Sequence, residues 1–224
     1  MCRFWSKMTH WPINTYPETT LIKHHGYHHH VLATQALRAV SELAENNDNR
    51  ALLGKIGACE LVADMIKTHG SKYPVVSEIA FRAVMNLSYD HVANRTSLGK
   101  AGVCEELVSF LRSRYHDREI AGCCATAMMN LSNNCVANKM KFGDVGACEL
   151  IVTLFRKYSK LKALVQPLCG CVKNLSAHCE PNRLKFMARP DLKDLLEFII
   201  TGPMVDRQLR SWAKDALNAI IKQK

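Results

Sequence analysis

The sequence has few aromatic residues and no long apolar run. Phe, Trp and Tyr together make up 7% of its 224 residues, so the core consists mostly of Leu, Val, Ala, Met and Cys, which suits helices that lie close together. No apolar run approaches the 18 or more residues that a membrane-spanning helix needs. Phosphate-binding glycine-rich loops, Gly-x-Ser-x-Gly elbows and His-Glu-x-x-His helices are also missing. These gaps argue against a membrane protein and against several common classes of enzyme.

The ten cysteines do not follow the pattern of a secreted disulfide framework. Cys59, Cys104 and Cys148 lie 45 and 44 residues apart, each in a Gly-x-Cys-Glu context, and others lie in apolar helical runs, where a free thiol behaves as a small hydrophobe. Cys135 and Cys179 are also 44 residues apart, which indicates architecture, because a nucleophile is needed only once. With no secretory signal, these thiols predict an intracellular protein, cytoplasmic or nuclear, that is not an enzyme.

Internal repetition is the strongest feature of the sequence. A motif ending in Asn-Leu-Ser places Asn86, Asn130 and Asn174 44 residues apart, and Glu42 holds the same place one step earlier. A second ladder consists of the pairs Asn49-Arg50, Asn94-Arg95, Asn138-Lys139 and Asn182-Arg183. A third ladder consists of Gly57, Gly102, Gly146 and Pro190. Three ladders in one register predict about four and a half structural repeats.

Each complete unit is predicted to contain three helices. The Asn of the Asn-Arg pair suits the N-cap of a short first helix, and the Gly suits the left-handed residue that ends it. A second helix follows, and the longer third helix carries the Asn-Leu-Ser motif, with apolar residues at steps of 4, 3, 1 and 3 along one helical face. The predicted units are 31–46 (the third helix of a partial unit), 47–91, 92–135, 136–179 and 180–224.

These ladders resemble armadillo repeats, which have three helices per roughly 40–47 residues. The resemblance rests on the Ala-x-x-Asn-Leu-Ser helix, the Asn-Arg opening and the Gly-Ala-Cys-Glu step, and it covers about Val31 to Ile221. It implies an all-α fold, a right-handed α-solenoid whose third helices line a concave groove. It also implies a protein that holds extended peptides of other proteins in that groove.

One departure from the family concerns the importin-type members, which carry a Trp four residues before the groove Asn. Here that place is held by Arg38, Arg82, Thr126 and Gly170. The binding of a lysine-rich nuclear-localisation peptide is therefore not expected.

The polar stripe of the third helix is the candidate peptide-binding site. Its places are the motif Asn and the residues four and eight positions before it, which lie on successive turns of one face. The candidate residues are Arg38, Glu42, Arg82, Asn86, Asn130, Gln166 and Asn174. Each Asn amide offers a donor and an acceptor to a peptide backbone, and the alternative left open is that these amides bridge neighbouring repeats. Gly122 and Gly170 in the same stripe predict shallow pockets for partner side chains.

Residues 1–30 do not fit the repeat. Half of the ten histidines of the chain lie in the run 24–30, and such a cluster is able to bind Zn, Ni or Cu. The His-x3-His or Cys-x2-Cys spacing of a folded zinc site is missing, so we predict a poorly ordered leader with neither metal nor cofactor. The array opens on a third helix without its first two, which leaves open that the chain is a fragment of a longer repeat protein.

The net charge of +10, from 30 basic and 20 acidic residues, favours acidic partners. Two functions compete: a scaffold whose groove binds an extended or acidic segment of another protein, and a basic surface that binds nucleic acid or an anionic membrane. Basic residues gather at the loops from second to third helix, namely Arg112, Arg114, Arg118, Arg156, Lys157, Lys160 and Lys162. We expect no aromatic side chains to interleave with them for base stacking. The scaffold is therefore favoured, with no small-molecule substrate.

Overall fold

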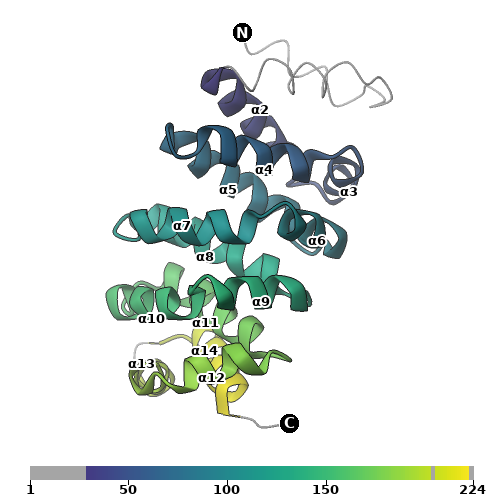
Figure 1. Cartoon of the computed structure of the whole chain (residues 1–224). Helices are drawn as coiled ribbons and strands as arrows, with labels where there is room; N and C mark the ends of the chain where they lie inside the picture. The colour runs from purple at the N-terminus through teal and green to yellow at the C-terminus, as the bar shows by residue number, and fades with distance from the viewer. Residues whose placement is uncertain (1–28, 203–204, 222–224) are drawn as a thin grey trace.

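The protein is all-α, as Figure 1 shows. The computed structural model describes residues 29–202 and 205–221, and within these ranges thirteen helices and no strand are present. The run of histidines therefore lies outside the described residues, except for His29 and His30. None of the helices in these ranges combines the length and the apolarity required to cross a bilayer.

The helices follow one another as repeated triplets. The first helices are α3 (Asn47–Lys55), α6 (Val92–Lys100), α9 (Val136–Asp144) and α12 (Glu180–Met187). The second helices are α4 (Ala58–His69), α7 (Val103–Arg114), α10 (Ala147–Tyr158) and α13 (Pro190–Thr201). The third helices are α5 (Pro74–Ser88), α8 (Arg118–Ser132), α11 (Lys162–Ser176) and α14 (Arg207–Ile221), preceded by α2 (His30–Leu43), which lacks a first and a second helix before it in the described residues.

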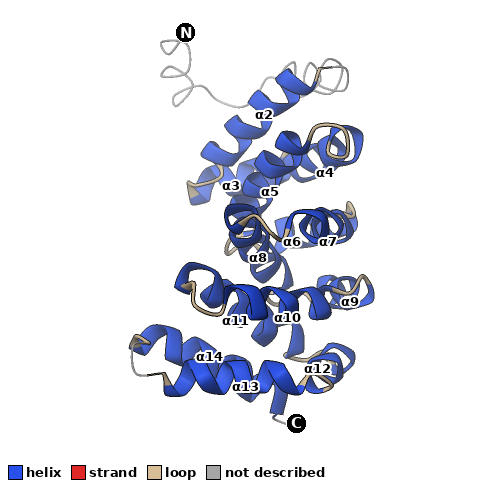
Figure 2. Ribbon diagram, turned by 90° about the vertical axis from the view of Figure 1, so that its left-hand side faces the viewer, coloured by secondary structure: helices blue, strands red, loops and turns tan. Residues whose placement is uncertain are grey.

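The third helices form the spine of a right-handed α-solenoid. Each packs most extensively against the third helix of the next unit, in the order α2, α5, α8, α11, α14. In Figure 2, α8 and α11 lie toward one side of the molecule and α7, α9 and α12 toward the other. The predicted apolar face is the core, since Val76, Ala80, Leu87, Leu131 and Leu175 are fully buried. Small residues such as Ala80 let the helices approach closely.

Glycine ends the first helix of three units, as predicted. Gly57, Gly102 and Gly146 have φ values of 85°, 89° and 80°. This left-handed backbone conformation has little steric cost for glycine, because glycine has no Cβ. The second helix starts at the next residue, which is why this step repeats so strictly in the sequence.

The prediction that the Asn of the Asn-Arg pair is an N-cap is wrong. The N-cap residues of the first helices are Asn46, His91, Cys135 and Cys179. Asn94 lies inside α6 and is buried, and its Nδ2 donates to Arg50 O at 3.1 Å and to Leu87 O at 2.9 Å in the preceding unit. Asn138 and Asn182 make the equivalent bond to the carbonyl of residues 95 and 139. This ladder therefore joins units, because a buried amide requires partners.

These buried amides require glycine in the unit before them. A Cβ on Gly54, Gly99 or Gly143 would overlap the side-chain oxygen of the Asn that follows about one repeat later. The three glycines lie within first helices, where glycine is otherwise unfavourable relative to alanine. Each pair of Gly and Asn is thus one close contact between successive first helices.

The basic residue of each Asn-Arg pair is buried and donates to a carbonyl at the end of a third helix or just beyond it. Arg95 Nε donates to Ser88 O at 2.8 Å, at the end of α5, and its Nη1 donates to Asn133 O at 3.2 Å, just beyond α8. Lys139 Nζ reaches Ala177 O at 2.6 Å in the same way. Carbonyls at helix C-termini carry partial negative charge and lack intrahelical partners, so a cation stabilises them. Burial lowers the pKa of both Arg95 and Lys139.

The first testable prediction concerns the contact between Gly99 and Asn138. Gly99→Ala should lower the free energy of unfolding by roughly 2–4 kcal/mol, because the buried Asn138 amide must leave its carbonyl partners. Gly122→Ala is the matched control: a Cβ there meets only Leu164 Cγ at 3.9 Å, so it should be neutral or stabilise by up to about 1 kcal/mol. Urea unfolding followed by circular dichroism measures both. Equal effects of the two substitutions would contradict the assigned contact.

A second prediction concerns the core of the spine. Leu131 has no exposed surface and belongs to α8, which packs against α5 and α11, so Leu131→Ala should cost roughly 2–5 kcal/mol in the same measurement. A loss below about half a kcal/mol would show that the register of α8 is wrong.

Candidate interaction surface on the third helices

The candidate site is the stripe predicted on the third helices, here called the inner row. It comprises Thr34, Arg38, Glu42, Glu78, Arg82, Asn86, Gly122, Thr126, Asn130, Gln166, Gly170 and Asn174. Arg38, Glu42 and Arg82 are exposed, Asn86, Gln166 and Asn174 are half-buried, and Asn130 is only 7% exposed. Because each third helix packs on the next, residues one repeat apart are brought near each other along the spine.

The three Asn amides of the inner row tie successive third helices together. Asn86 Nδ2 donates to Ser41 O at 2.9 Å, Asn130 Nδ2 to Met85 O at 3.0 Å, and Asn174 Nδ2 to Met129 O at 2.9 Å. Each acceptor lies in the last turn of the preceding third helix, where carbonyls have no intrahelical partner. This is the bridging arrangement that the sequence left open beside peptide binding.

The same amides keep an acceptor available. The Oδ1 atoms of Asn86, Asn130 and Asn174 accept no hydrogen bond from the described residues, and they are not among the buried side-chain atoms that lack a partner. The donor side of each amide stabilises the stack, and the acceptor side remains available to a ligand.

The charges of the inner row are mixed. Arg38 and Arg82 are accompanied by Glu42 and by the half-buried Glu78. None of these four takes part in an ion pair among the described residues. The N-terminal half of the row therefore has two cations and two carboxylates and no net charge.

The two glycines of the inner row have different surroundings. Gly122 is half-buried and open, since a Cβ there would meet only Leu164. Gly170 is buried, and a Cβ there would overlap Met129 Sδ and lie 3.0 Å from a ring atom of Trp212. The prediction of a pocket at Gly170 is therefore wrong, because Met129 of α8 and Trp212 of α14 fill the space. Trp212 has no counterpart in the other repeats, so the ladders gave no signal for it.

A small hollow lies beside the inner row between α5 and α8. It has a volume of about 70 Å³, and Glu78, Arg82, Phe81, Phe110 and Ile120 are among the residues that line it. Phe81 and Phe110 form its apolar floor, with ring centroids 5.3 Å apart. The hollow offers an apolar surface with charged groups at its margin, which suits a side chain of a peptide rather than a substrate.

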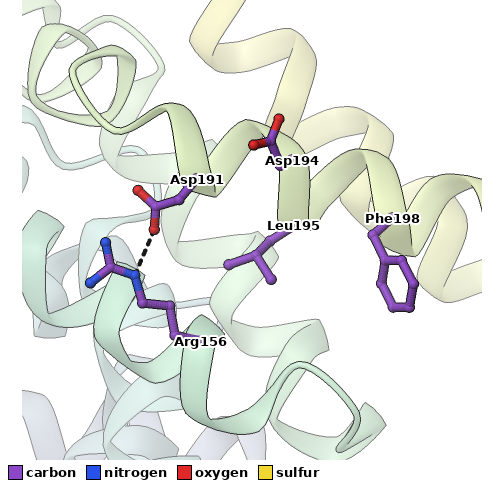
Figure 3. A pocket seen from close by; sticks show the side chains of 5 residues that line it. All are labelled: Arg156, Asp191, Asp194, Leu195 and Phe198. Atoms are coloured by element: carbon purple, nitrogen blue, oxygen red, sulfur yellow. Dashed lines mark hydrogen bonds and ion pairs between the residues drawn. The ribbon is translucent and has the colours of Figure 1, made fainter.

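A second hollow lies between α10 and α13, as Figure 3 shows. It has a volume of about 450 Å³ and is lined by Arg156, Asp191, Asp194, Leu195 and Phe198. Arg156 Nε lies 2.6 Å from Asp191 Oδ2, and this ion pair lowers the pKa of Asp191. Phe198 is 63% exposed. The hollow contains no Ser, Cys or His that would serve as a nucleophile or base.

The described cysteines are free thiols in apolar surroundings. Burial raises the pKa of Cys59, Cys148 and Cys169 to about 12, and it raises the pKa of Cys104 and Cys171 further. A thiol that stays protonated is a poor nucleophile and a poor metal ligand. Nor do the residues described bring three or more His, Cys, Asp or Glu together in a group that could hold a metal ion.

Neither a protein-family model nor a curated protein sequence matches the chain. Solved structures do match it. A designed armadillo repeat protein in complex with the peptide (KR)4 is 19% identical, with a TM-score of 0.69 over 86% of this chain and 77% of that one. Computationally designed armadillo repeat proteins for modular peptide recognition give the same figures. The armadillo-repeats-only protein of Plasmodium falciparum is 14% identical, with a TM-score of 0.68 over 84% and 80% of the two chains. The chain therefore has the armadillo-type repeat fold.

The buried thiols generate a prediction about alkaline pH. Their pKa is raised from the usual 9.0, so the unfolded chain ionises first and the folded state becomes less stable as pH rises from 9 to about 12. Between pH 8 and pH 10 each thiol should remove about 1 kcal/mol of unfolding free energy. Over this pH interval, the unfolding free energy of Cys59→Ala should therefore fall by about 1 kcal/mol less than that of the parent, as measured by urea titrations. An identical loss in both proteins would show that Cys59 does not contribute.

Proposed function

We propose that this armadillo-type array is an interaction scaffold that binds an extended segment of another protein along the inner row. The observation that carries the proposal is the free Oδ1 of Asn86, Asn130 and Asn174, which recurs once in each of three units. An extended peptide has backbone N–H groups without partners, and these amide oxygens are suited to accept from them. The remaining Nδ2 hydrogen of Asn130 and of Asn174 is suited to donate to a peptide carbonyl, whereas Asn86 Nδ2 also donates to Ser41 Oγ at 3.3 Å.

The spacing of the units supports this mode of binding. Packed helices lie about 8–10 Å apart, and an extended chain rises about 3.3 Å per residue. One unit therefore spans two to three residues of a bound peptide. A side chain between two amides would face Gly122 or the hollow lined by Phe81, Phe110 and Ile120.

The charge of the partner segment is a separate question. The expectation of acidic segments rested on the net charge of +10, but within the inner row Arg38 and Arg82 are accompanied by Glu42 and Glu78. The proposed ligand is therefore an extended segment that is held mainly by hydrogen bonds to its backbone. The part of the segment that faces residues 38–82 is expected to carry both acidic and basic side chains. Arg82→Glu should lower the affinity for acidic peptides more than the affinity for other peptides. This difference should decrease as the salt concentration rises, because exposed charges are screened beyond about 10 Å at 0.1 M.

The structural neighbours support a peptide ligand. One was solved with the basic peptide (KR)4, and others were designed for modular peptide recognition. We infer that the chain is not an enzyme, because its described thiols except Cys123 are buried, and several of them recur at the repeat spacing. Replacing all three asparagines would test the row poorly, since these amides also hold the third helices together.

The test is Gly122→Tyr. A tyrosine there should project over the middle of the inner row without disturbing the core, because only Leu164 lies within 4 Å of the added Cβ. Peptides selected from a displayed random library against the full chain should bind Gly122→Tyr at least about ten-fold more weakly, measured by fluorescence anisotropy. The melting temperature should stay close to that of the parent.

The matched control is Ser109→Tyr, which adds the same ring at an exposed position of the second helix α7. It should leave peptide binding unchanged. Selected peptides that bind both variants as tightly as the parent would show that the ligand lies elsewhere.

A further inference from the structure

Much of the basic charge of the chain is committed to helix ends. Eight basic side chains donate hydrogen bonds to backbone carbonyls: Arg50, Arg95, Arg112, Lys139, Lys141, Arg183, Lys185 and Arg210. Four others form ion pairs with carboxylates, namely Arg156, Lys162, Lys173 and Lys193. The net charge therefore overstates the positive charge that a partner would meet.

Four of the cations that lack such a partner among the described residues lie together at two adjacent turns. Arg114 and Arg118 flank the turn between α7 and α8, and Lys157 and Lys160 lie at the turn between α10 and α11. We call these four residues, with Tyr115, His116 and Tyr158, the basic edge. None of the four cations has a hydrogen bond or an ion pair among the described residues, and three of them are exposed, while Arg114 is half-buried.

The two turns are held together by one tyrosine. Tyr158 Oη donates to Tyr115 O at 3.0 Å and to His116 O at 2.8 Å. Figure 2, in which this side of the molecule faces the viewer, shows the turns of successive units one above another. The cations of the two units thus form one fixed surface rather than two independent loops.

Aromatic rings interleave with these cations, contrary to the expectation from the sequence. Tyr115 and His116 have ring centroids 3.9 Å apart, and Lys157 Nζ lies 5.6 Å from the centroid of Tyr158. The pattern continues one unit earlier, where Lys72 Nζ lies 5.3 Å from the Tyr73 ring, which stacks on His30 at 3.8 Å. The sequence disfavours nucleic acid because it predicts no such rings beside the cations, and the rings found at this edge remove that reason.

Acidic groups reduce the positive charge of the edge only in part. Asp117 lies in the first turn, but its carboxylate accepts the backbone N–H groups of Glu119 and Ile120 and so caps α8. Glu119 is exposed beside it. No carboxylate lies within the turn formed by residues 159–161. Four free cations and two carboxylates leave the edge with net positive charge.

We propose that the basic edge binds single-stranded nucleic acid. The four cations contact phosphates, and the tyrosine and histidine rings stack with bases, the combination on which binding of single strands without sequence preference depends. An anionic membrane fits less well, because the only aliphatic side chain of these turns, Leu161, is half-buried and cannot insert deeply. An acidic peptide would satisfy the cations but would make no use of the exposed His116 ring.

The test uses the full chain and a labelled oligothymidylate of about 12 nucleotides, followed by fluorescence anisotropy at several salt concentrations. The parent should bind, and Arg114→Gln/Arg118→Gln and Lys157→Gln/Lys160→Gln should each bind roughly ten-fold more weakly. The slope of log affinity against log salt should fall by about 1.4 in each, since each phosphate contact in a single strand contributes about 0.7. Tyr115→Leu should weaken binding at every salt concentration and leave this slope unchanged.

The matched control is Lys55→Gln/Lys100→Gln, which removes the same charge from exposed positions at the ends of α3 and α6. It should change affinity less than about two-fold. An equal loss in control and edge variants would overturn the proposal, because the binding would then follow net charge alone. A poly-glutamate peptide, or vesicles containing phosphatidylserine, that bound the edge more tightly than the oligonucleotide would overturn it as well. Gly122→Tyr should leave oligonucleotide binding intact, so this result is independent of the peptide proposal.

Discussion

The carbonyl groups at the ends of the helices are the constraint on which the stack depends. A short array of helices has many C-terminal carbonyls without intrahelical partners, and here side chains from neighbouring units supply the donors. Asn130 reaches Met85 O in the last turn of α5, and Lys141 reaches Gly99 O in the last turn of α6. Asn138 adds a bond to Arg95 O inside α6. These bonds join residues 42 to 45 positions apart, so a length change in one unit would break several of them together. The constant repeat length follows from this.

The same constraint shapes the composition. A basic side chain that donates to a backbone carbonyl needs no Asp or Glu as a partner. Cations are suitable donors here because the carbonyls at a helix C-terminus carry partial negative charge. The chain consequently carries more Arg and Lys than Asp and Glu without an equally basic surface. Buried cations such as Arg95 and Lys139 donate to backbone carbonyls of the same chain and are not accessible to a partner. Net charge alone was therefore a poor guide to the chemistry of a partner.

The sequence predicted the helices and the core well, because both depend on local periodicity. The left-handed glycines and the buried face with Leu131 lie where the ladders place them. The sequence did not predict which neighbouring residue a polar side chain contacts. A ladder gives only the position of a residue within its repeat unit. Asn94 has the character of an N-cap but lies inside a helix and bonds to the unit before it. The space at Gly170 is filled by Trp212, which no ladder includes.

The two proposed binding surfaces meet on one helix. Arg118, at the start of α8, belongs to the basic edge, and Gly122, Thr126 and Asn130 follow on the inner row at intervals of one turn, about 5.4 Å. The bond from Asn130 to Met85 O fixes this helix to α5, so neither surface moves independently of the other. A peptide confined to the inner row leaves the turn at 115–118 free, and a nucleic acid on the edge leaves the amide oxygens free. Only a ligand that extends across the first turn of α8 would compete for both, and its binding would then depend on salt as well as on Gly122.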